Sequence, residues 1–433
     1  MKTFAEVIEY LYARLPMFTR DGASAINPDV DNTLLLCEAL GNPQQQFKSI
    51  HIAGTNGKGS TSHMMASVLQ ASGHKTGLYT SPHLVDFRER IRIDGQMIPQ
   101  QNVIDFINAN QTLIETIKPS FFEVTVALAF DYFAKNKVDI AVIEVGLGGR
   151  LDSTNIIHPV LSMITNIGMD HMNVLGNTLV EIAGEKAGII KEGTPVVISE
   201  RQASIQHVFQ NKAAALNAPL YFANDYYQVA AVNRKNDGLY IDILDKAKQV
   251  STNWHLDLAG GYQQKNILGV LCAVDKLREL GLNLPNEQVV YGLGNVQEST
   301  GLRGRWQTLS EHPWIICDTG HNEDGIREVL ANLASLSYDK LHFIFGAMRD
   351  KDLSHILPQL PKDAIYYFAA PDMPRAMPAD QLRELAATFG LKGNDYNRIS
   401  DAFLAAKQQV KDNELIFIGG STFVVADVLT NHF

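Results

Sequence analysis

The feature that most constrains the fold of this chain is a glycine-rich loop between an apolar strand pattern and a helical pattern. Residues 49–53 (SIHIA) predict a buried strand, residues 54–60 read GTNGKGS, and a helix is predicted from about Ser60 to Ser72. Glycines let backbone N–H groups approach a phosphate, and the following helix points its positive end at the anion. Lys58 adds a point charge near the β- and γ-phosphates. The loop therefore predicts a nucleotide-binding α/β domain.

This loop departs in two places from the common phosphate-loop pattern GxxxxGK[ST]. Ile52 stands where the first glycine is usual, and Gly59 separates Lys58 from Ser60. A plain glycine-rich turn is the simpler alternative, but the flanking strand and helix favour nucleotide binding. The departure argues against an ordinary kinase or GTPase of the P-loop class.

Strand and helix patterns alternate around the loop and predict a doubly wound, mainly parallel sheet. Further strands are predicted at 75–80, 138–145, 160–165 and 195–199, and helices at 121–136 and 262–280. Residues 219–257 behave differently, because YYQVAAV and GLYIDIL flank a polar turn. They predict an antiparallel hairpin at the edge of the sheet.

The pattern restarts at Trp306 and predicts a second, smaller α/β domain of the Rossmann-like type. Its four predicted strands lie in WIICDTG, LHFIFGAM, AIYYFAAP and ELIFIGG. The 433 residues suffice for two domains, since single cores rarely grow beyond roughly 250–300 residues. We expect a first domain at 1–296, a linker at 297–305 and a second domain at 306–433.

The composition narrows the possible partners. A formal net charge of −10 argues against a nucleic-acid or anionic membrane surface. The three cysteines are far apart in sequence, which suits a reducing compartment, and no stretch reaches the ~18 apolar residues of a membrane span. Residues 1–16 predict an amphipathic helix rather than a signal peptide. We expect a cytoplasmic monomer with small-molecule partners, and neither a nucleic-acid nor a membrane partner.

Several polar residues follow predicted strands. Glu144 ends a buried strand, where open α/β sheets bind ligands, and as a Mg²⁺ ligand it would help to bridge ATP phosphates. Alone, such a glutamate is more often a solvated loop residue; next to the phosphate loop, the metal role is favoured. By spacing alone His171 is an ordinary loop residue, Lys186 an ordinary helix residue, and Thr80 to His83 a capped turn.

Nine motifs occur in an order that resembles folylpolyglutamate synthase and dihydrofolate synthase, members of the wider Mur-ligase superfamily. They run from about residue 26 to the terminal GGSTFVVADVL. They are GTNGKGS, TSPHL with FRERI, EVGLGGRLDSTN (144–155), NIGMDH (166–171), EKAGI (185–189), GGYQQKN (260–266), RGR (303–305), DTGHN (318–322) and FGAMRDKD (345–352).

The resemblance implies an ATP-dependent ligase that adds L-glutamate to dihydropteroate, to reduced folates, or to both. A substrate carboxylate attacks the γ-phosphate, and the amino group of glutamate then displaces phosphate from the acyl phosphate. Residues 1–296 would be the ATP-binding central domain, and 306–433 the glutamate-ligase domain. The implied cofactors are ATP, Mg²⁺ and a carbamate that CO₂ forms on Lys186. The carbamate matters for metal binding, because an ammonium repels Mg²⁺ whereas a carbamate presents oxygens to it.

The same resemblance implies roles for individual residues. The catalytic set is Lys58, Glu144, His171 and Lys186, and the Mg²⁺ ligands are Ser81, Glu144, His171 and Lys186. The ATP contacts are Gly54, Thr55, Asn56, Gly57, Lys58, Gly59, Ser60, Asn266, Arg305 and Asp318. The pterin-side residues are Phe122, Asp152, Ser153 and Thr154, and the glutamate contacts are His321 and Ser421.

Two motifs depart from the family pattern. Arg303 stands where the linker of the family usually has proline. The loss of the proline alters the expected stiffness of the hinge, but Arg305 is still present. The usual Asp-Gly-Ala-His-Asn is Asp318-Thr-Gly-His-Asn here, with its polar residues kept. Phe122 also has a plain alternative as a core residue, although a flat pterin stacks well on an aromatic ring.

Two other functions share parts of this sequence. A peptidoglycan-precursor ligase would have the loop and the lysine but usually an extra N-terminal domain, for which the residues before the loop strand leave no room. A non-catalytic nucleotide-binding module would not need Glu144. We favour a bifunctional enzyme slightly over one that only elongates glutamate chains, because Phe122 and 152–154 fit a dihydropteroate pocket.

Overall fold

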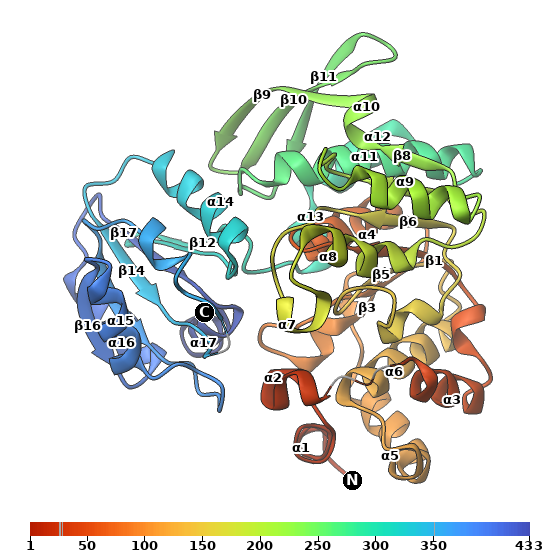
Figure 1. The fold of residues 1–433 in the computed structure, drawn as a ribbon, viewed down its shortest axis with the longest axis horizontal. Coiled ribbons are helices and arrows are strands. Elements are labelled where there is room, and N and C mark those ends of the chain that lie inside the picture. Colours follow the sequence, from red (N-terminus) through yellow and green to blue (C-terminus); the bar gives the residue numbers. More distant parts are fainter. Residues whose placement is uncertain (26, 28, 350) are drawn as a thin grey trace. The chain divides into compact units, whose positions relative to one another are not determined.

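The computed structural model describes residues 1–25, 27, 29–349 and 351–433. The chain divides into two compact units (Figure 1). The first comprises residues 1–257 and 263–302, and the second comprises 258–262 and 303–433.

The first unit is built on an eight-stranded sheet in the order β4-β3-β2-β5-β1-β6-β7-β8. Its strands are β1 (Lys48–Ala53), β2 (Thr76–Tyr79), β3 (Ile91–Ile93), β4 (Gln96–Met97), β5 (Ile140–Glu144), β6 (Leu161–Ile164), β7 (Val196–Ile198) and β8 (Leu220–Phe222). In this order, the neighbours β2, β5, β1, β6, β7 and β8 all pair in parallel. The two remaining pairs, β2 with β3 and β3 with β4, are antiparallel. The predicted doubly wound, mainly parallel sheet is confirmed.

The helices of this unit alternate with the strands only in part, since several follow one another directly, and four of them match the helices predicted at 1–16, 60–72, 121–136 and 262–280. In chain order, the helices are α1 (Phe4–Arg14), α2 (Phe18–Asp21), α3 (Asp31–Ala39), α4 (Lys58–Ala71), α5 (Gln100–Ile117), α6 (Phe121–Lys135), α7 (Met172–Leu175), α8 (Leu179–Lys186), α9 (Gln206–Ala215), α10 (Ala223–Tyr226), α11 (Gln263–Glu279), α12 (Asn286–Gly294) and α13 (Val296–Thr300). Helix α4 begins at Lys58, two residues earlier than predicted, and residues 60–69 within it are all buried. A helix that is buried on all sides lies in a core rather than on the surface. Helix α4 accordingly contacts strands β1, β2 and β5 as well as helices α11, α12 and α13.

The strands that follow β8 correct one expectation. Strands β9 (Tyr227–Lys235), β10 (Gly238–Asp245) and β11 (Val250–Leu256) form a separate three-stranded antiparallel sheet, not a hairpin at the edge of the main sheet (Figure 1). Leu239, Ile241 and Ile243 alternate along β10 and are buried, and the sheet contacts α11 and α12. These helices bury the apolar face, so pairing with the main sheet is not needed.

The second unit contains a six-stranded sheet in the order β12-β13-β17-β14-β15-β16. Its elements are β12 (Gln307–Glu311), β13 (Trp314–Cys317), α14 (Glu323–Ala334), β14 (Leu341–Phe345), β15 (Ile365–Ala369), α15 (Ala379–Thr388), β16 (Lys392–Tyr396), α16 (Ile399–Gln409), β17 (Leu415–Gly419) and α17 (Thr422–His432). All neighbours pair in parallel except β12 with β13. The four predicted strands are β13, β14, β15 and β17.

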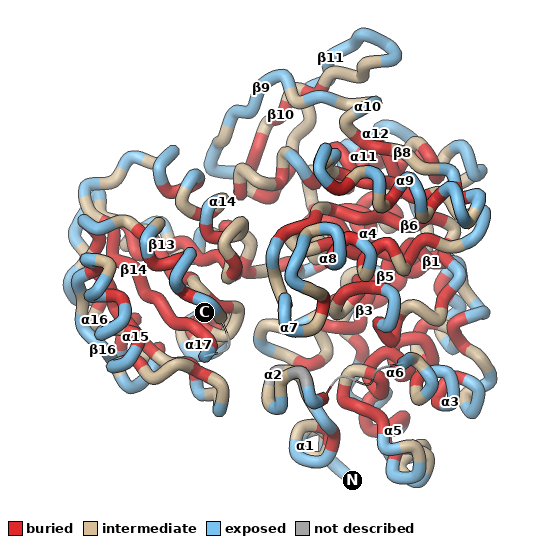
Figure 2. Tube along the Cα trace, viewed as in Figure 1, coloured by how far each residue is buried: buried red, intermediate tan, exposed pale blue. Residues whose placement is uncertain are grey.

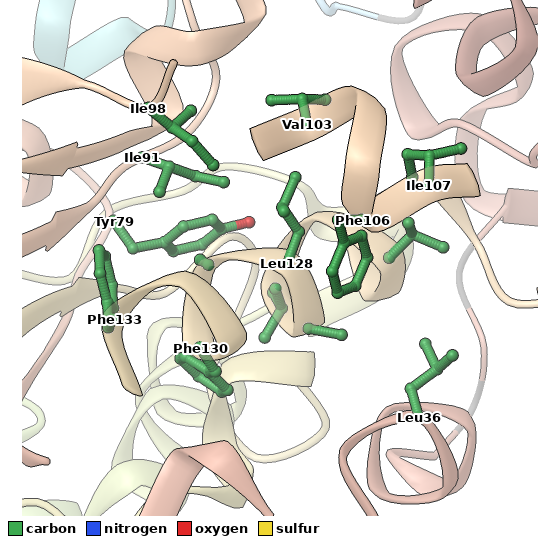
Figure 3. Packing of buried hydrophobic residues seen from close by; sticks show 14 of the residues in the cluster. Leu36, Tyr79, Ile91, Ile98, Val103, Phe106, Ile107, Leu128, Phe130 and Phe133 are labelled. Atoms are coloured by element: carbon green, nitrogen blue, oxygen red, sulfur yellow. The ribbon is translucent and has the colours of Figure 1, made fainter. Parts of the chain in front are cut away.

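Burial is concentrated in the strands and in the helices against them (Figure 2). On one face of the first sheet, Tyr79 of β2 and Ile91 of β3 lie with Leu128, Phe130 and Phe133 of α6 in one hydrophobic cluster (Figure 3). The three cysteines are buried and unbridged. Within the described part of the chain, no helix is both long enough and apolar enough to cross a membrane.

Candidate active site

Two glycines of the loop after β1 occupy positions where a side chain cannot fit. Gly54 has a φ of 148°, and a Cβ there would lie 1.8 Å from Thr165 Oγ1. Gly57 has a φ of 87°, and its Cβ would lie 2.4 Å from Asn266 Oδ1. The loop therefore needs glycine both for its backbone angles and for its close neighbours.

The segment after β6 holds this loop from one side. The N–H of Thr55 donates to the carbonyl of Asn166, and the N–H of Asn56 donates to Asn166 Oδ1, both at 2.9 Å. Thr165 Oγ1 donates to the carbonyl of Asn56 at 2.6 Å. Since β1 and β6 are parallel neighbours, their carboxyl ends meet at one sheet edge, where open α/β sheets bind ligands.

The start of α11 holds the loop and α4 from another side. Gln263 Nε2 donates to Ser60 Oγ at 3.0 Å, and Asn266 Nδ2 donates to Gln263 Oε1 at 2.7 Å. Asn266 also lies against Gly57. The structure thus brings Asn266 together with residues 54–60, although 206 or more residues separate them in the sequence.

Two lysines converge on the carbonyl oxygen of Gly54. Lys58 Nζ donates to it at 3.0 Å, and Lys186 Nζ donates to it at 2.9 Å. Lys186 is only 4% exposed. Burial, and then the charge of Lys58, lower the pKa of Lys186 to about 7, while Asp170 and Asp152 oppose the shift. Near neutral pH, this amine is therefore partly uncharged and able to act as a nucleophile.

Glu144 and Ser81 meet at the carboxyl ends of β5 and β2. Glu144 is 4% exposed, and its Oε2 accepts a hydrogen bond of 3.1 Å from the N–H of Ser81. In the register of the sheet, Glu144 lies opposite Ile52 of β1, which is two residues before Gly54. The carboxylate therefore emerges beside the phosphate loop.

His171 stands in the segment after β6, next to Asp170. It precedes α7 with a φ of 51°, its Nε2 lies 3.9 Å from Asp170 Oδ2, and its ring meets Phe18 edge-on at 5.6 Å. The described residues contain no group of three or more His, Cys, Asp or Glu side chains that could hold a metal ion. The donors present, a buried carboxylate and a hydroxyl, suit Mg²⁺, which takes few protein ligands and completes its shell with phosphate and water.

An aromatic side chain and a buried carboxylate lie beyond Glu144. The ring of Phe122 rests on Gly146, where a Cβ would come within 2.4 Å of it, and lies 6.1 Å from the ring of Tyr79. Asp152 Oδ2 accepts from the N–H of Leu147 at 2.8 Å, and burial raises the pKa of Asp152. Phe122 is therefore positioned over the glycine loop that follows β5.

The residues after Asp152 form a short polar chain. Its Oδ1 accepts from the N–H of Thr154 at 3.0 Å, and Thr154 Oγ1 lies 2.9 Å from His51 Nε2. Burial lowers the pKa of His51 to about 3, so the ring is neutral. Ser153 is buried beside them. The structure thus joins residues 152–154 to β1 through His51, which the sequence did not single out.

In the second unit, Asp318 organises the loop after β13. Its Oδ2 accepts from Tyr262 Oη at 2.6 Å and from the N–H of Trp306 at 2.8 Å, and its Oδ1 accepts from the N–H of Gly320 at 2.7 Å. Burial raises the pKa of Asp318. Arg305 donates to Thr319 Oγ1 in the same loop.

The two remaining residues of the second unit lie at the carboxyl ends of neighbouring parallel strands. His321 follows β13, and its Nδ1 lies 3.0 Å from the carbonyl of Thr319. Ser421 follows β17, and its Oγ accepts from the N–H of Phe423 at the start of α17. Two residues at or within the motifs, Ile26 and Asp350, lie outside the described residues.

Besides His51, four partners of the site that lie inside motifs were not predicted individually. They are Asn166, Asp170, Tyr262 and Gln263, and each stands inside a motif read from the sequence. The side chains of Asn166, Tyr262 and Gln263 bond to residues far along the chain, so the motifs were visible in the sequence but these contacts were not. Asp170 Oδ2 lies 3.9 Å from Nε2 of its neighbour His171.

Comparison with known proteins places this geometry in a family. Residues 52–274 match the Mur ligase middle domain, and residues 304–422 match the Mur ligase glutamate ligase domain. The chain is 32% identical over 413 residues to the dihydrofolate synthase/folylpolyglutamate synthase of Bacillus subtilis, covering 93% of this chain and 94% of the relative. It is 33% identical to the folylpolyglutamate synthase of Lacticaseibacillus casei, covering 98% of this chain and 97% of that one.

Solved structures agree with the sequence relatives. Escherichia coli FolC in complex with DHPP and ADP superposes with a TM-score of 0.84 at 26% identity, covering 99% of this chain and 97% of that one. Mycobacterium tuberculosis folylpolyglutamate synthase complexed with ADP and AMPPCP gives a TM-score of 0.86 at 28% identity, covering 99% and 98%. The chain therefore belongs to the dihydrofolate synthase/folylpolyglutamate synthase family of Mur-type ligases.

Proposed function

We propose that this chain is an ATP-dependent ligase that joins L-glutamate to dihydropteroate, to reduced folates, or to both, through an acyl phosphate. The observation that carries the proposal is the arrangement of Lys58, Lys186 and Glu144 around the loop of residues 54–60. The names of the relatives, and the DHPP and ADP bound to the E. coli enzyme, support this chemistry.

The reaction needs positioning and charge neutralisation more than it needs a protein nucleophile. Residues 54–60 bind the phosphates through backbone N–H groups, and Lys58 moves from the Gly54 carbonyl to the β- and γ-phosphates. An oxygen of the acceptor carboxylate attacks the γ-phosphorus and releases ADP. The amino group of glutamate then attacks the acyl carbon, loses a proton and expels phosphate, which leaves an amide.

Ser81, Glu144, His171 and a carbamate on Lys186 would hold Mg²⁺. When bound, Mg²⁺ neutralises charge on the phosphates. Lys186 reaches its carbamate by attack of the uncharged amine on CO₂ with loss of a proton. Its burial and its lowered pKa support that step, because they keep part of the amine uncharged near pH 7.

The other assignments follow the same scheme. Asn266, Arg305 and Asp318 contact the nucleotide, and His321 and Ser421 contact the incoming glutamate. Phe122 stacks on the pterin, while residues 152–154 bind its polar edge. We assign ATP binding to residues 1–296, the hinge to 297–305 and glutamate ligation to 306–433, in a cytoplasmic monomer.

A coupled assay tests the proposal. Purified protein should release phosphate from ATP only when an acceptor and L-glutamate are both present, and labelled glutamate should enter the acceptor. Running dihydropteroate and tetrahydrofolate in parallel separates a bifunctional enzyme, which uses both, from one that only elongates. ATP turnover that ignores both substrates would contradict the proposal.

A further inference from the structure

Gln202 lies in the segment that follows β7, at the carboxyl end of the first sheet. Strands β6 and β7 are parallel neighbours, and their pairing continues beyond the end of β7. The N–H of Ser199 donates to the carbonyl of Ile164 at 2.9 Å. The N–H of Glu200 then donates to the carbonyl of Thr165 at 3.1 Å. The phosphate loop follows β1 at this same edge of the sheet, since β1 is the other parallel neighbour of β6.

The side chain of Gln202 makes the next contact with the segment after β6. The backbone turns towards α9 here, since the carbonyl of Gln202 accepts from the N–H groups of Ile205 and Gln206. The side-chain amide binds Ile167: Oε1 accepts from the N–H of Ile167 at 2.9 Å, and Nε2 donates to the carbonyl of Ile167 at 2.8 Å. A primary amide carries the same kind of donor and acceptor as a peptide group. One side chain therefore takes the place of a neighbouring strand.

The two chain neighbours of Ile167 bind the phosphate loop. Asn166 accepts from the N–H groups of Thr55 and Asn56, through its carbonyl and its Oδ1, both at 2.9 Å. The hydroxyl of Thr55 accepts from the N–H of Gly168 at 2.9 Å and donates to the carbonyl of Gly168 at 3.2 Å. Gln202 thus holds the middle residue of a tripeptide whose two outer residues hold the loop.

This tripeptide depends on such contacts for its conformation. Residues 165–168 belong to neither a helix nor a strand, so no regular hydrogen-bond ladder fixes their backbone. Ile167 is 3% exposed and packs in a hydrophobic cluster of the first unit. A buried peptide group without a partner is costly, and Gln202 supplies the partner for both the N–H and the carbonyl of Ile167.

We propose that Gln202 is a positioning residue for nucleotide binding: it fixes residues 166–168, and these hold the loop of residues 54–60 in the backbone conformation that binds phosphate. The inference rests on ATP binding, which is one part of the proposed function. It adds a residue that lies outside all nine sequence motifs. Gln202 acts through Ile167 and its neighbours, so its loss should affect the nucleotide and not the acceptor.

Hydrogen exchange in the ligand-free protein tests the positioning directly. Gln202→Leu removes both hydrogen bonds to Ile167 and leaves a side chain of similar length. The amides of residues 55, 56, 167 and 168 should then exchange about tenfold faster than in wild type, the effect expected from the loss of one or two hydrogen bonds. Amides of β5, which pairs with β1 on the side away from β6, should exchange as in wild type.

Binding and kinetics test the consequence for function. By isothermal titration calorimetry in a magnesium buffer, Gln202→Leu should bind ADP about tenfold more weakly than wild type. Its KM for ATP should rise by a similar factor, while its KM for the acceptor stays unchanged. Gln210→Leu is the matched control, because Gln210 is an exposed glutamine on α9, and it should behave as wild type does. If Gln202→Leu does not fold, Gln202→Asn replaces it; its amide is one methylene shorter, and it should show a smaller rise in the KM for ATP alone.

Three outcomes would overturn the inference. They are an unchanged affinity of the folded variant for ADP, a parallel rise of the KM values for ATP and for the acceptor, and an equal acceleration of exchange in β5, as a purely structural role would give. If wild type binds ADP, each of these results defeats the inference about Gln202 alone. A wild-type protein that binds no ADP and incorporates no glutamate defeats the proposed function instead.

Discussion

Lys58 and Lys186 donate hydrogen bonds to the same oxygen, the carbonyl of Gly54, at 3.0 and 2.9 Å. Burial, and then repulsion by the charge of Lys58, lower the pKa of Lys186 to about 7. The arrangement links the phosphate loop to the residue proposed to carry a carbamate, and it leads to the first three predictions.

Replacement of Lys186 by alanine should reduce glutamate incorporation by at least about 100-fold, since one proposed metal ligand is lost. Bicarbonate or a short carboxylate such as acetate should restore part of the rate by placing oxygens in the vacated space. Lys191→Ala is the matched control, because Lys191 binds the carbonyl of Asn155 and has no proposed role. A fully active Lys186→Ala enzyme would exclude the carbamate.

Activation by CO₂ should depend on pH. With a pKa of about 7, about one-tenth of the Lys186 amine is uncharged at pH 6 and about nine-tenths at pH 8. At a fixed concentration of dissolved CO₂, the initial rate of carbamate formation, followed with ¹³CO₂ by NMR, should therefore rise through this interval and level off above it. A rate that is flat from pH 6 to 8 would contradict the lowered pKa.

The same lowered pKa predicts an effect on stability. The ordinary lysine value of 10.5 applies to the unfolded chain, so below about pH 7 both states are protonated and the folded state carries the full cost of a buried charge. As pH rises from 7 to 10.5, the folded amine is neutral and wild type gains stability. In CO₂-free buffer, Lys186→Met should melt above wild type at pH 6, and the difference should shrink towards pH 10.

Much of the fold was predictable because its signals are local. The strand before Gly54 has apolar residues at 50, 52 and 53, and the helix after the loop has the apolar residues 64–66, 68 and 69, so both could be predicted from short segments of sequence. Strands β12 and β16 were missed because QTLSE and KGNDY are polar edge strands without an apolar pattern. The separate sheet of β9 to β11 was misplaced because its covering helices come later in the chain.

The site divides in the same way. Motifs identified residues 54–60 and Lys186, but their meeting at one carbonyl joins positions 132 residues apart and needs the fold.

Substitution of Gly57 tests the geometry of the loop. Gly57→Ala should weaken ADP binding by at least about tenfold, because its Cβ would overlap Asn266 at 2.4 Å in addition to the strain of a positive φ. Gly73→Ala is matched in φ, 84° against 87°, but a Cβ there meets nothing within 4 Å. By isothermal titration calorimetry it should bind ADP as wild type does. Equal affinities for both variants would contradict the packing described for the loop.

Phe122→Ala should raise the KM for dihydropteroate about tenfold and leave the KM for ATP unchanged, since a stacked base on an aromatic ring is worth about 1–3 kcal/mol. Phe122→Tyr, which keeps the ring, serves as the control. Steady-state kinetics with each substrate varied in turn measures both constants. A parallel rise in both KM values would point to a packing role instead.

The most direct test of the central claim follows one oxygen atom. The acceptor is prepared with ¹⁸O in its carboxylate, and the phosphate released during amide formation is analysed by mass spectrometry. An acyl phosphate predicts one ¹⁸O in the phosphate for each glutamate joined, because the attacking carboxylate oxygen leaves with the phosphorus. Phosphate without ¹⁸O, formed while glutamate is being incorporated, would contradict the mechanism.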